Sequence, residues 1–359
     1  MTNYSGNKGE WSEVYVLFRV LEEAKLFAAD ENLNKIDSVF YEVQGVTRDE
    51  KDSVIEFNID NVGRNVDVLK DYIKIATIGQ DELKSVADRL LEELKTRQGA
   101  AYEIPTIAQV LQRLGIETLK AKSSVKSDIR IQVHDINTGF DALQGFSIKS
   151  RLGSPSSLIN ASKSTRFVYE VSGIDESNIQ QFNDTKRFKD KFTLLNEIGA
   201  QVKYSHMVND VFENNLMLID SYLPEICAHL LMEYYEHGLG NIEDALDALT
   251  KQNPLGYNMS KGHPFYTYKF KKVLTECALG MLPATTWNGI VDATGGYIIV
   301  REDGEVLCYH LFNRNEFEGY LLKNTKFDTP STSKHDHGYI FEDGGKYYLM
   351  LGMMVRFKK

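Results

Sequence analysis

Several features that define other protein classes are missing from this sequence of 359 residues. It contains no run of 18 apolar residues, so we expect no membrane-spanning helix. Residues 1–10 lack an apolar stretch, so we expect no secretory signal peptide. The three cysteines, Cys227, Cys277 and Cys308, lie far apart. This spacing argues against a disulfide framework or a zinc site and favours buried thiols in a reducing compartment, so we expect a cytoplasmic protein.

Signatures of several common enzyme classes are also missing. The sequence has no glycine-rich phosphate loop, no nucleophile elbow and no pair of cysteines separated by two residues. The chain has fewer basic than acidic residues, with 41 Lys and Arg against 51 Asp and Glu, which gives a net charge of −10. This balance argues against a general polyanion-binding protein. Residues 120–170 are the exception, with eight basic and four acidic side chains, which suits a local phosphate contact.

The apolar pattern predicts an α/β protein with a mixed sheet flanked by helices. Apolar residues recur at helical spacing over residues 8–23 and 81–97, and Asn7 with Glu10 forms a capping-box pattern at the start of the first helix. A shorter helix is expected over residues 156–162. Strand-like runs and hairpin turns predict strands at residues 39–43, 54–59, 165–171, 295–300, 305–311, 339–341 and 347–351. We place a soft domain boundary near residue 260, with a β-rich portion after it.

The most informative pattern is a predicted hairpin in the basic segment. Its first strand begins at Asp128, it turns at residues 135–139, and it returns through residues 145–150. Strand alternation puts Asp128 on the polar face of the first strand and Ser147 and Lys149 on the polar face of the second. A Mg²⁺-dependent nuclease needs this combination, because Asp128 can bind the metal and Lys149 can lie beside the attacking water. An ordinary antiparallel hairpin would show the same alternation.

The hairpin resembles the core of the PD-(D/E)XK nuclease superfamily, many of whose members place an acid two residues before the lysine. Here that position is Ser147, whose neutral hydroxyl is a weaker Mg²⁺ ligand, so a second carboxylate has to come from elsewhere. The stretch Lys8–Glu13 resembles the Lys-Gly-x-x-x-Glu pattern that opens the leading helix in several members. The resemblance implies Glu13 as that carboxylate. The alternative oxygen donors are Asp141 and Gln144.

A second candidate for DNA contact lies near the C-terminus. Residues 324–338 are rich in hydroxyls and lysines and have too little apolar content to form core. Such side chains suit phosphate contacts and base-edge contacts in a major groove. The candidates are Lys326, Asp328, Thr329, Ser331, Thr332 and Lys334. An ordinary surface loop would have a similar composition.

Taken together, these stretches resemble the HpaII-type restriction endonucleases. The similarity covers nearly the whole chain, in residues 6–13, 28–36, 145–153, 158–162 and 324–334. It implies a type II enzyme that hydrolyses double-stranded DNA with Mg²⁺, at CCGG, beside a cognate DNA methyltransferase. It also implies a PD-(D/E)XK-like nuclease core, which we place in residues 1–260, with residues 261–359 contributing to DNA recognition. A homodimer is compatible with the sequence.

Two other functions fit the same residues. One is a different Mg²⁺-dependent nuclease of the same superfamily, such as a repair or junction-cleaving enzyme. The other is a non-catalytic DNA-binding module that keeps the hairpin only as scaffold. Mg²⁺-dependent cleavage of duplex DNA separates the enzymes from the binding module.

Overall fold

The computed structural model describes residues 4–120, 127–135, 139–331 and 337–359. The chain forms two compact units, each assembled from separate stretches of sequence. Unit 1 comprises Met1–Ser156, Val291–Tyr320 and Lys359, and unit 2 comprises Ser157–Ile290 and Leu321–Lys358. The chain passes from one unit to the other after residues 156, 290, 320 and 358, not near residue 260. The functional division into residues 1–260 and 261–359 remains a prediction.

Within the described residues, unit 1 is built on a nine-stranded sheet with the order β2-β14-β13-β9-β8-β3-β4-β5-β6. The pairs β9–β13 and β2–β14 are parallel, and the neighbouring pairs along the rest of the sheet are antiparallel. The predicted mixed sheet is therefore confirmed. Its strands are β2 (Lys25–Ala29), β3 (Lys35–Asp49), β4 (Val54–Asp60), β5 (Asn65–Lys70), β6 (Ile73–Gly79), β8 (Ile129–Asp135), β9 (Phe140–Ser150), β13 (Gly296–Val300) and β14 (Val306–His310).

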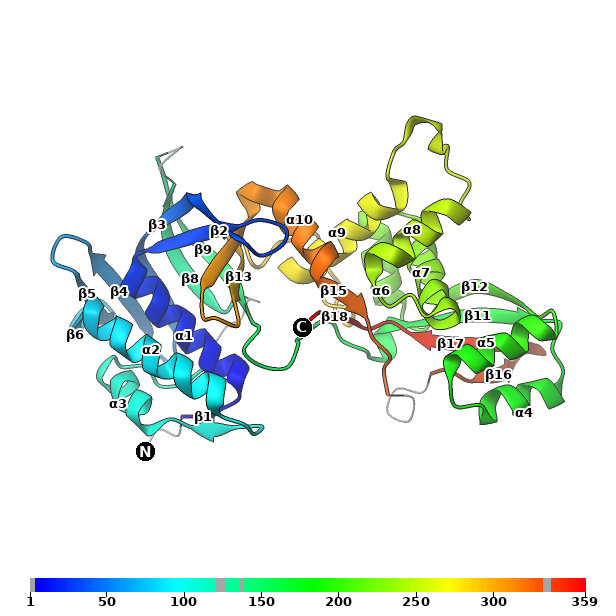
Figure 1. The fold of residues 1–359 in the computed structure, drawn as a ribbon, viewed down its shortest axis with the longest axis horizontal. Helices are drawn as coiled ribbons and strands as arrows, with labels where there is room; N and C mark the ends of the chain where they lie inside the picture. The colour runs from blue at the N-terminus through cyan, green and yellow to red at the C-terminus, as the bar shows by residue number, and fades with distance from the viewer. Residues whose placement is uncertain (1–3, 121–126, 136–138, 332–336) are drawn as a thin grey trace. The chain divides into compact units, whose positions relative to one another are not determined.

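The helices of unit 1 share one hydrophobic core with this sheet. Their bounds are α1 (Lys8–Glu23), α2 (Gln80–Thr96) and α3 (Pro105–Arg113). In Figure 1, α1 and α2 lie side by side against the sheet. Apolar residues at helical spacing on each helix, such as Trp11 and Leu90, are fully buried in that core. The predicted capping box is present, since Asn7 Oδ1 accepts from Glu10 N at 3.1 Å and Glu10 Oε2 accepts from Asn7 N at 2.8 Å. The first helix was thus predicted correctly at both ends.

Strand β3 organises the middle of the sheet because it pairs with β2, β4 and β8. It is much longer than the predicted strand at residues 39–43. Its pairing with β8 shifts register between Val43 and Gly45. A Cβ on Gly45 would lie 2.7 Å from the Phe57 carbonyl oxygen of β4, so this close approach requires glycine. The long strand brings residues 46–49 alongside the start of β8, where the candidate Asp128 lies.

Unit 2 contains a four-stranded antiparallel sheet with the order β12-β11-β17-β16. Helix α7 anchors to it through Tyr169 Oη, which donates to Ala228 O at 2.8 Å, and Tyr235 Oη, which donates to Gly352 O at 2.7 Å. The strands are β11 (Arg166–Ser172), β12 (Gln201–Met207), β16 (Ile340–Asp343) and β17 (Lys346–Gly352). The helices are α4 (Glu176–Asp184), α5 (Phe188–Glu197), α6 (Asp210–Ile219), α7 (Leu223–His237), α8 (Ile242–Gln252) and α9 (Phe265–Leu279).

Smaller elements complete the chain. A three-stranded sheet in unit 2 has the order β10-β18-β15, and a two-stranded pair in unit 1 joins β1 and β7. Helix α10 (Arg314–Asn324) continues from unit 1 into unit 2. No helix in the described ranges is both long enough and apolar enough to cross a membrane. The remaining strands are β1 (Ser5–Gly6), β7 (Tyr102–Glu103), β10 (Ser157–Ile159), β15 (Thr325–Phe327) and β18 (Val355–Phe357), and the 3₁₀ turns are Lys163–Thr165, Met259–Lys261 and Leu311–Asn313.

One predicted element is wrong. Residues 156–162 were expected to form a short helix, but they contain strand β10. Ser157 pairs with Arg356 of β18, about 200 positions further along the chain. A local pattern of small and polar residues does not report such a distant partner, and tertiary pairing outweighs weak local preference here.

Candidate active site

The hairpin places three of the four predicted catalytic residues, Asp128, Ser147 and Lys149, in one hydrogen-bonded row. Ile129 of β8 pairs with Phe146 of β9, and Asp128 N donates to Phe146 O at 2.8 Å. Asp128 therefore lies opposite Ser147. Ser147 Oγ donates to Asp128 Oδ2 at 3.1 Å, and Lys149 Nζ donates to Ser147 Oγ at 3.3 Å. The two polar strand faces meet as predicted.

Asp128 is oriented by the backbone as well as by the serine. Its Oδ2 also accepts from the Ile148 amide at 2.7 Å. Hydrogen bonds fix one carboxylate oxygen, while the structure shows no hydrogen bond to Oδ1 from any described residue. A fixed carboxylate with one oxygen available is a suitable ligand for a hard cation. Ser147 itself is buried, with 2% of its surface exposed, so its hydroxyl acts within the row rather than in open solvent.

Glu13 on α1 brings the second carboxylate. Its Oε2 is buried and has no hydrogen-bond partner among the described residues. Burial, together with the negative charge of Asp128, raises the pKa of Glu13 to about 8. The positive charges of Arg48 and Lys120 lower this pKa and partly offset the increase. A buried carboxylate oxygen without a partner is costly, and a bound cation would relieve that cost.

Lys149 is similarly perturbed. Burial lowers its pKa below the usual value, while the charges of Asp128 and Glu13 work against that shift. Its Nζ also lies 5.4 Å from the ring centroid of Tyr297 on β13. A lysine with a lowered pKa gives up its proton more readily than an ordinary lysine, which suits proton transfer. The charge of Asp128 acts on both Glu13 and Lys149, and the charge of Glu13 acts on Lys149. The three side chains therefore lie close enough to form one site.

The donor set fits Mg²⁺, although no group of three His, Cys, Asp or Glu side chains suited to a metal ion occurs in the described part of the chain. Mg²⁺ keeps several waters and is commonly held by one or two carboxylates together with substrate phosphate oxygens. Asp128 with a free oxygen and Glu13 with an orphaned one meet that requirement. Zinc would require more nitrogen or sulfur ligands than this site offers.

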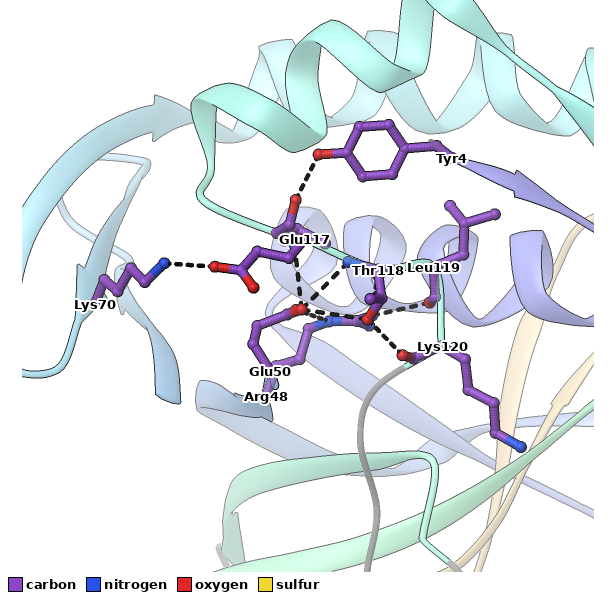
Figure 2. Close-up of polar contacts among 9 residues, drawn as sticks. Tyr4, Arg48, Glu50, Lys70, Glu117, Thr118, Leu119 and Lys120 are labelled. Carbon is purple, nitrogen blue, oxygen red and sulfur yellow. Dashed lines mark hydrogen bonds and ion pairs between the residues drawn. The ribbon is translucent and has the colours of Figure 1, made fainter. Parts of the chain in front are cut away.

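A buried ion pair next to this site fastens the chain segment that leads to Lys120. Arg48 Nε and Glu50 Oε1 are 2.7 Å apart, and both side chains are at most 5% exposed. Glu50 Oε2 accepts from the amides of Glu117 and Thr118 at 3.1 and 3.2 Å, and Arg48 donates to the carbonyls of Thr118 and Leu119 (Figure 2). The pair therefore fixes the backbone of residues 117–119, with Glu50 accepting from its amides and Arg48 donating to its carbonyls. It thereby also positions Arg48 and Lys120, the two cations that lower the pKa of Glu13.

We expect Glu50→Ala to lower the free energy of unfolding by about 3–5 kcal/mol, because it leaves the buried Arg48 charge without its partner. Urea unfolding measures this loss. The matched control is Lys70→Ala, which removes the partially exposed Lys70–Glu117 pair and should cost less than about 1 kcal/mol. Equal effects of the two substitutions would contradict the structural role of the Arg48–Glu50 pair.

A cavity of about 940 Å³ opens on this site in unit 1. Of the four candidate catalytic residues, Glu13 and Lys149 line it. Its walls also include the start of α1, Lys95 in the last turn of α2, residues 97–99 after that helix, and residues 150–156 from the end of β9 onward. The candidate site is thus open to a substrate larger than water.

The alternative oxygen donors have other partners. Asp141 Oδ1 lies 2.8 Å from His134 Nδ1 and accepts from Gln44 Nε2 at 3.0 Å. Gln144 Oε1 lies 2.5 Å from His310 Nε2. Neither contact involves Glu13 or Lys149, so Glu13 remains the better candidate for the second carboxylate.

The predicted DNA-contacting residues belong to unit 2. Lys326 on β15 is exposed, Asp328 pairs with Arg356 at 3.2 Å, and Thr329 Oγ1 lies 2.6 Å from Tyr234 Oη. Ser331 is exposed. Thr332 and Lys334 lie outside the described residues. A DNA contact by these side chains remains a prediction.

Sequence reasoning predicted Lys149 but missed the roles of Arg48, Lys120 and the cavity-lining Lys95 and Arg97. Arg48 reaches the site through the pairing of β3 with β8, which is a long-range contact. Arg48 is buried although β3 mixes buried and exposed residues, and in the sequence it stands in the charged run of residues 48–52, so no local pattern indicated its burial.

The comparisons with known proteins agree with one another. A family model described as HpaII restriction endonuclease matches residues 7–357. The chain belongs to the HpaII restriction endonuclease family. It is 41% identical over 355 residues, or 99% of both chains, to a protein of Haemophilus parainfluenzae named Type II restriction enzyme HpaII. No solved structure matches the chain.

Membership in the HpaII restriction endonuclease family confirms the resemblance found in the sequence and gives the enzyme class. The chain is a type II restriction enzyme, a site-specific endonuclease. The family match extends through both units. Both units therefore belong to the conserved enzyme architecture, and neither is an unrelated fusion.

Proposed function

We propose that the chain is a Mg²⁺-dependent type II restriction endonuclease that hydrolyses double-stranded DNA at CCGG, through a PD-(D/E)XK-like site of Asp128, Ser147, Lys149 and Glu13. The observation that carries this proposal is the hydrogen-bonded row from Lys149 through Ser147 to Asp128, next to the orphaned carboxylate oxygen of Glu13. Two carboxylates can hold a metal ion that stabilises the phosphate charge, and a lysine beside them can lie next to the attacking water. The sequence CCGG comes from the family resemblance.

The reaction joins a water oxygen to phosphorus and breaks the bond from phosphorus to the leaving oxygen. It is slow without a catalyst because the phosphate is negatively charged and water is a weak nucleophile. A bound Mg²⁺ would supply Lewis-acid stabilisation of the phosphate charge. Asp128 and Glu13 would hold it, Asp128 being oriented by the Ile148 amide and the Ser147 hydroxyl.

Lys149 would orient the attacking water, accept its proton when neutral, and offset charge on the phosphate when protonated. The lowered pKa of Lys149 brings both forms closer to working pH. Ser147 fixes the ammonium by accepting its hydrogen bond. In this proposal Ser147 positions the lysine and the aspartate, in place of the acid that many members of the superfamily have at this point.

Target recognition would involve unit 2. We propose that Lys326, Asp328, Thr329 and Ser331, together with Thr332 and Lys334, contact the duplex. Hydroxyl and amine groups suit phosphates and base edges. A homodimer would supply one site for each strand of the palindromic target. A cognate DNA methyltransferase would protect the host by modifying the same sequence.

Two short duplexes that differ only at the site test this function. The enzyme with Mg²⁺ should cut a duplex with one CCGG and leave a duplex with CGCG in its place intact. Chelation by EDTA should stop cleavage, and methylation of the cytosines at the site should block it. Cleavage of the CGCG duplex at a similar rate would overturn the proposed specificity, and cleavage in EDTA would overturn the metal requirement.

A further inference from the structure

We propose that the wall of the unit 1 cavity formed by the start of α1 and the end of α2 binds the phosphate backbone of the duplex beside the phosphate that is cut. This inference rests on the proposed function and assigns a role to side chains outside the catalytic row. It concerns the cavity of about 940 Å³ that Glu13 and Lys149 also line. If the phosphate to be cut lies next to Lys149, the neighbouring phosphates of the same DNA strand would lie in this cavity.

The charge of the cavity wall differs from that of the whole chain. The protein carries a net charge of −10, yet basic side chains dominate the described lining. The carboxylates there are Glu13, which belongs to the candidate site, and Glu302. A concentration of positive charge on an acidic protein favours a polyanion locally. The basic side chains are Lys8, Lys95, Arg97, Lys149, Arg151 and Lys359.

Two of these cations are available for a phosphate. Lys8 Nζ donates to the Leu152 carbonyl at 3.3 Å, and Lys95 Nζ donates to the Asp303 carbonyl at 3.4 Å. Both acceptors are neutral, and neither ammonium has a carboxylate within salt-bridge distance among the residues described. Their charge is therefore not cancelled. Arg97 differs, because it is paired with Glu93.

The cavity suits a backbone better than a base. Its remaining lining includes Ser150, Gly153, Ser154 and Ser156, which offer hydroxyls and backbone amides, and the described lining has no aromatic side chain on which a base could stack. Such groups contact phosphate and sugar, and they position DNA without reading its sequence. The volume is at the upper end of ordinary ligand pockets, as expected for a stretch of polymer. Sequence reading is then left to other parts of the protein.

The test measures the salt dependence of DNA binding in EDTA, where cleavage plays no part. The variant is Lys8→Gln combined with Lys95→Gln, and the matched control is Lys84→Gln, an exposed lysine on the same helix as Lys95 that does not line the cavity. Each lost phosphate contact lowers the slope of log K against log salt by about 0.9. The double variant should lose about two units of slope, and Lys84→Gln should keep the wild-type slope.

The double variant should also bind CCGG and CGCG duplexes more weakly by the same factor, about tenfold or more at low salt. A wild-type slope in the double variant would overturn the inference, as would a loss confined to the CCGG duplex. Urea unfolding of each variant separates a loss of folding from a loss of contact. A wild type that binds duplex but never cuts it with Mg²⁺ would refute the proposed function alone, since the slope is measured without cleavage.

Discussion

Lys149→Ala should keep specific DNA binding and lose Mg²⁺-dependent cleavage by about 10³-fold. The substitution removes the group that orients the water and offsets the phosphate charge, and a single such group is worth roughly 10²–10⁴-fold in rate. The carboxylates of Asp128 and Glu13 remain. Single-turnover cleavage of a CCGG duplex measures the rate, and binding to the same duplex in EDTA measures the affinity.

Folding should not account for that loss. Lys149 is partly exposed, and the substitution removes its one hydrogen bond to Ser147 Oγ, so Lys149→Ala should remain folded, which urea unfolding checks. Lys84→Ala, on the outer surface of α2, serves as a control with normal cleavage. Unchanged cleavage by Lys149→Ala would remove Lys149 from the mechanism.

Glu13→Gln should reduce cleavage at low Mg²⁺ far more than Glu10→Gln does. Loss of even an indirect contact to a metal commonly costs about 10–100-fold in affinity, and a direct ligand should cost at least as much. Glu10 lies in the same helix, but its carboxylate serves the capping box, so its loss should cost about 1 kcal/mol of stability and little activity. Cleavage titrated with Mg²⁺ compares the two variants, and equal effects would argue against Glu13 as a ligand.

The raised pKa of Glu13 gives this prediction a pH signature. At a pKa of about 8, the carboxyl is mostly protonated at neutral pH, and a bound metal has to displace that proton. The apparent affinity for Mg²⁺ should therefore rise about tenfold per pH unit up to about pH 8 and then level off. Glu13→Gln should lose this dependence.

The stability of the metal-free protein should follow the opposite trend. The folded pKa of Glu13 lies above its ordinary value of 4.5, so the folded state binds the proton more tightly than the unfolded state. This contribution is complete below about pH 4.5 and is lost as the pH rises through about 8. Glu13→Gln should remove this loss and stabilise the metal-free protein at high pH by a few kcal/mol. In the proposed mechanism, Glu13 would thus lower the stability of the metal-free fold, and a bound metal would offset that loss.

Local patterns predicted the elements that carry the row of site residues. The capping box at Asn7 and Glu10 defined α1, and alternation along β8 and β9 placed Asp128 opposite Ser147. Both signals act over a few residues: the capping box through hydrogen bonds between side chains and backbone, and the alternation through the period of the strand. The position of Glu13 came from a family resemblance, and the structure adds its burial and its orphaned oxygen.

The remaining parts of the site depend on contacts between distant segments. Arg48 reaches the site because β3 continues to Asp49 beside β8, whereas the apolar pattern indicated a strand of five residues. Lys95 and Lys8 approach one cavity because α1 packs against α2. Side chains on two separate helices share no sequence pattern that would show their common surface.

Digestion of one plasmid of known sequence tests the central claim most directly. With Mg²⁺, the enzyme should produce the set of fragment sizes fixed by the CCGG positions, and none with EDTA. A discrete pattern that fits a different sequence would contradict the proposed specificity. An intact plasmid, or a smear without discrete fragments, would contradict the proposal that this chain is a Mg²⁺-dependent restriction endonuclease cutting at CCGG.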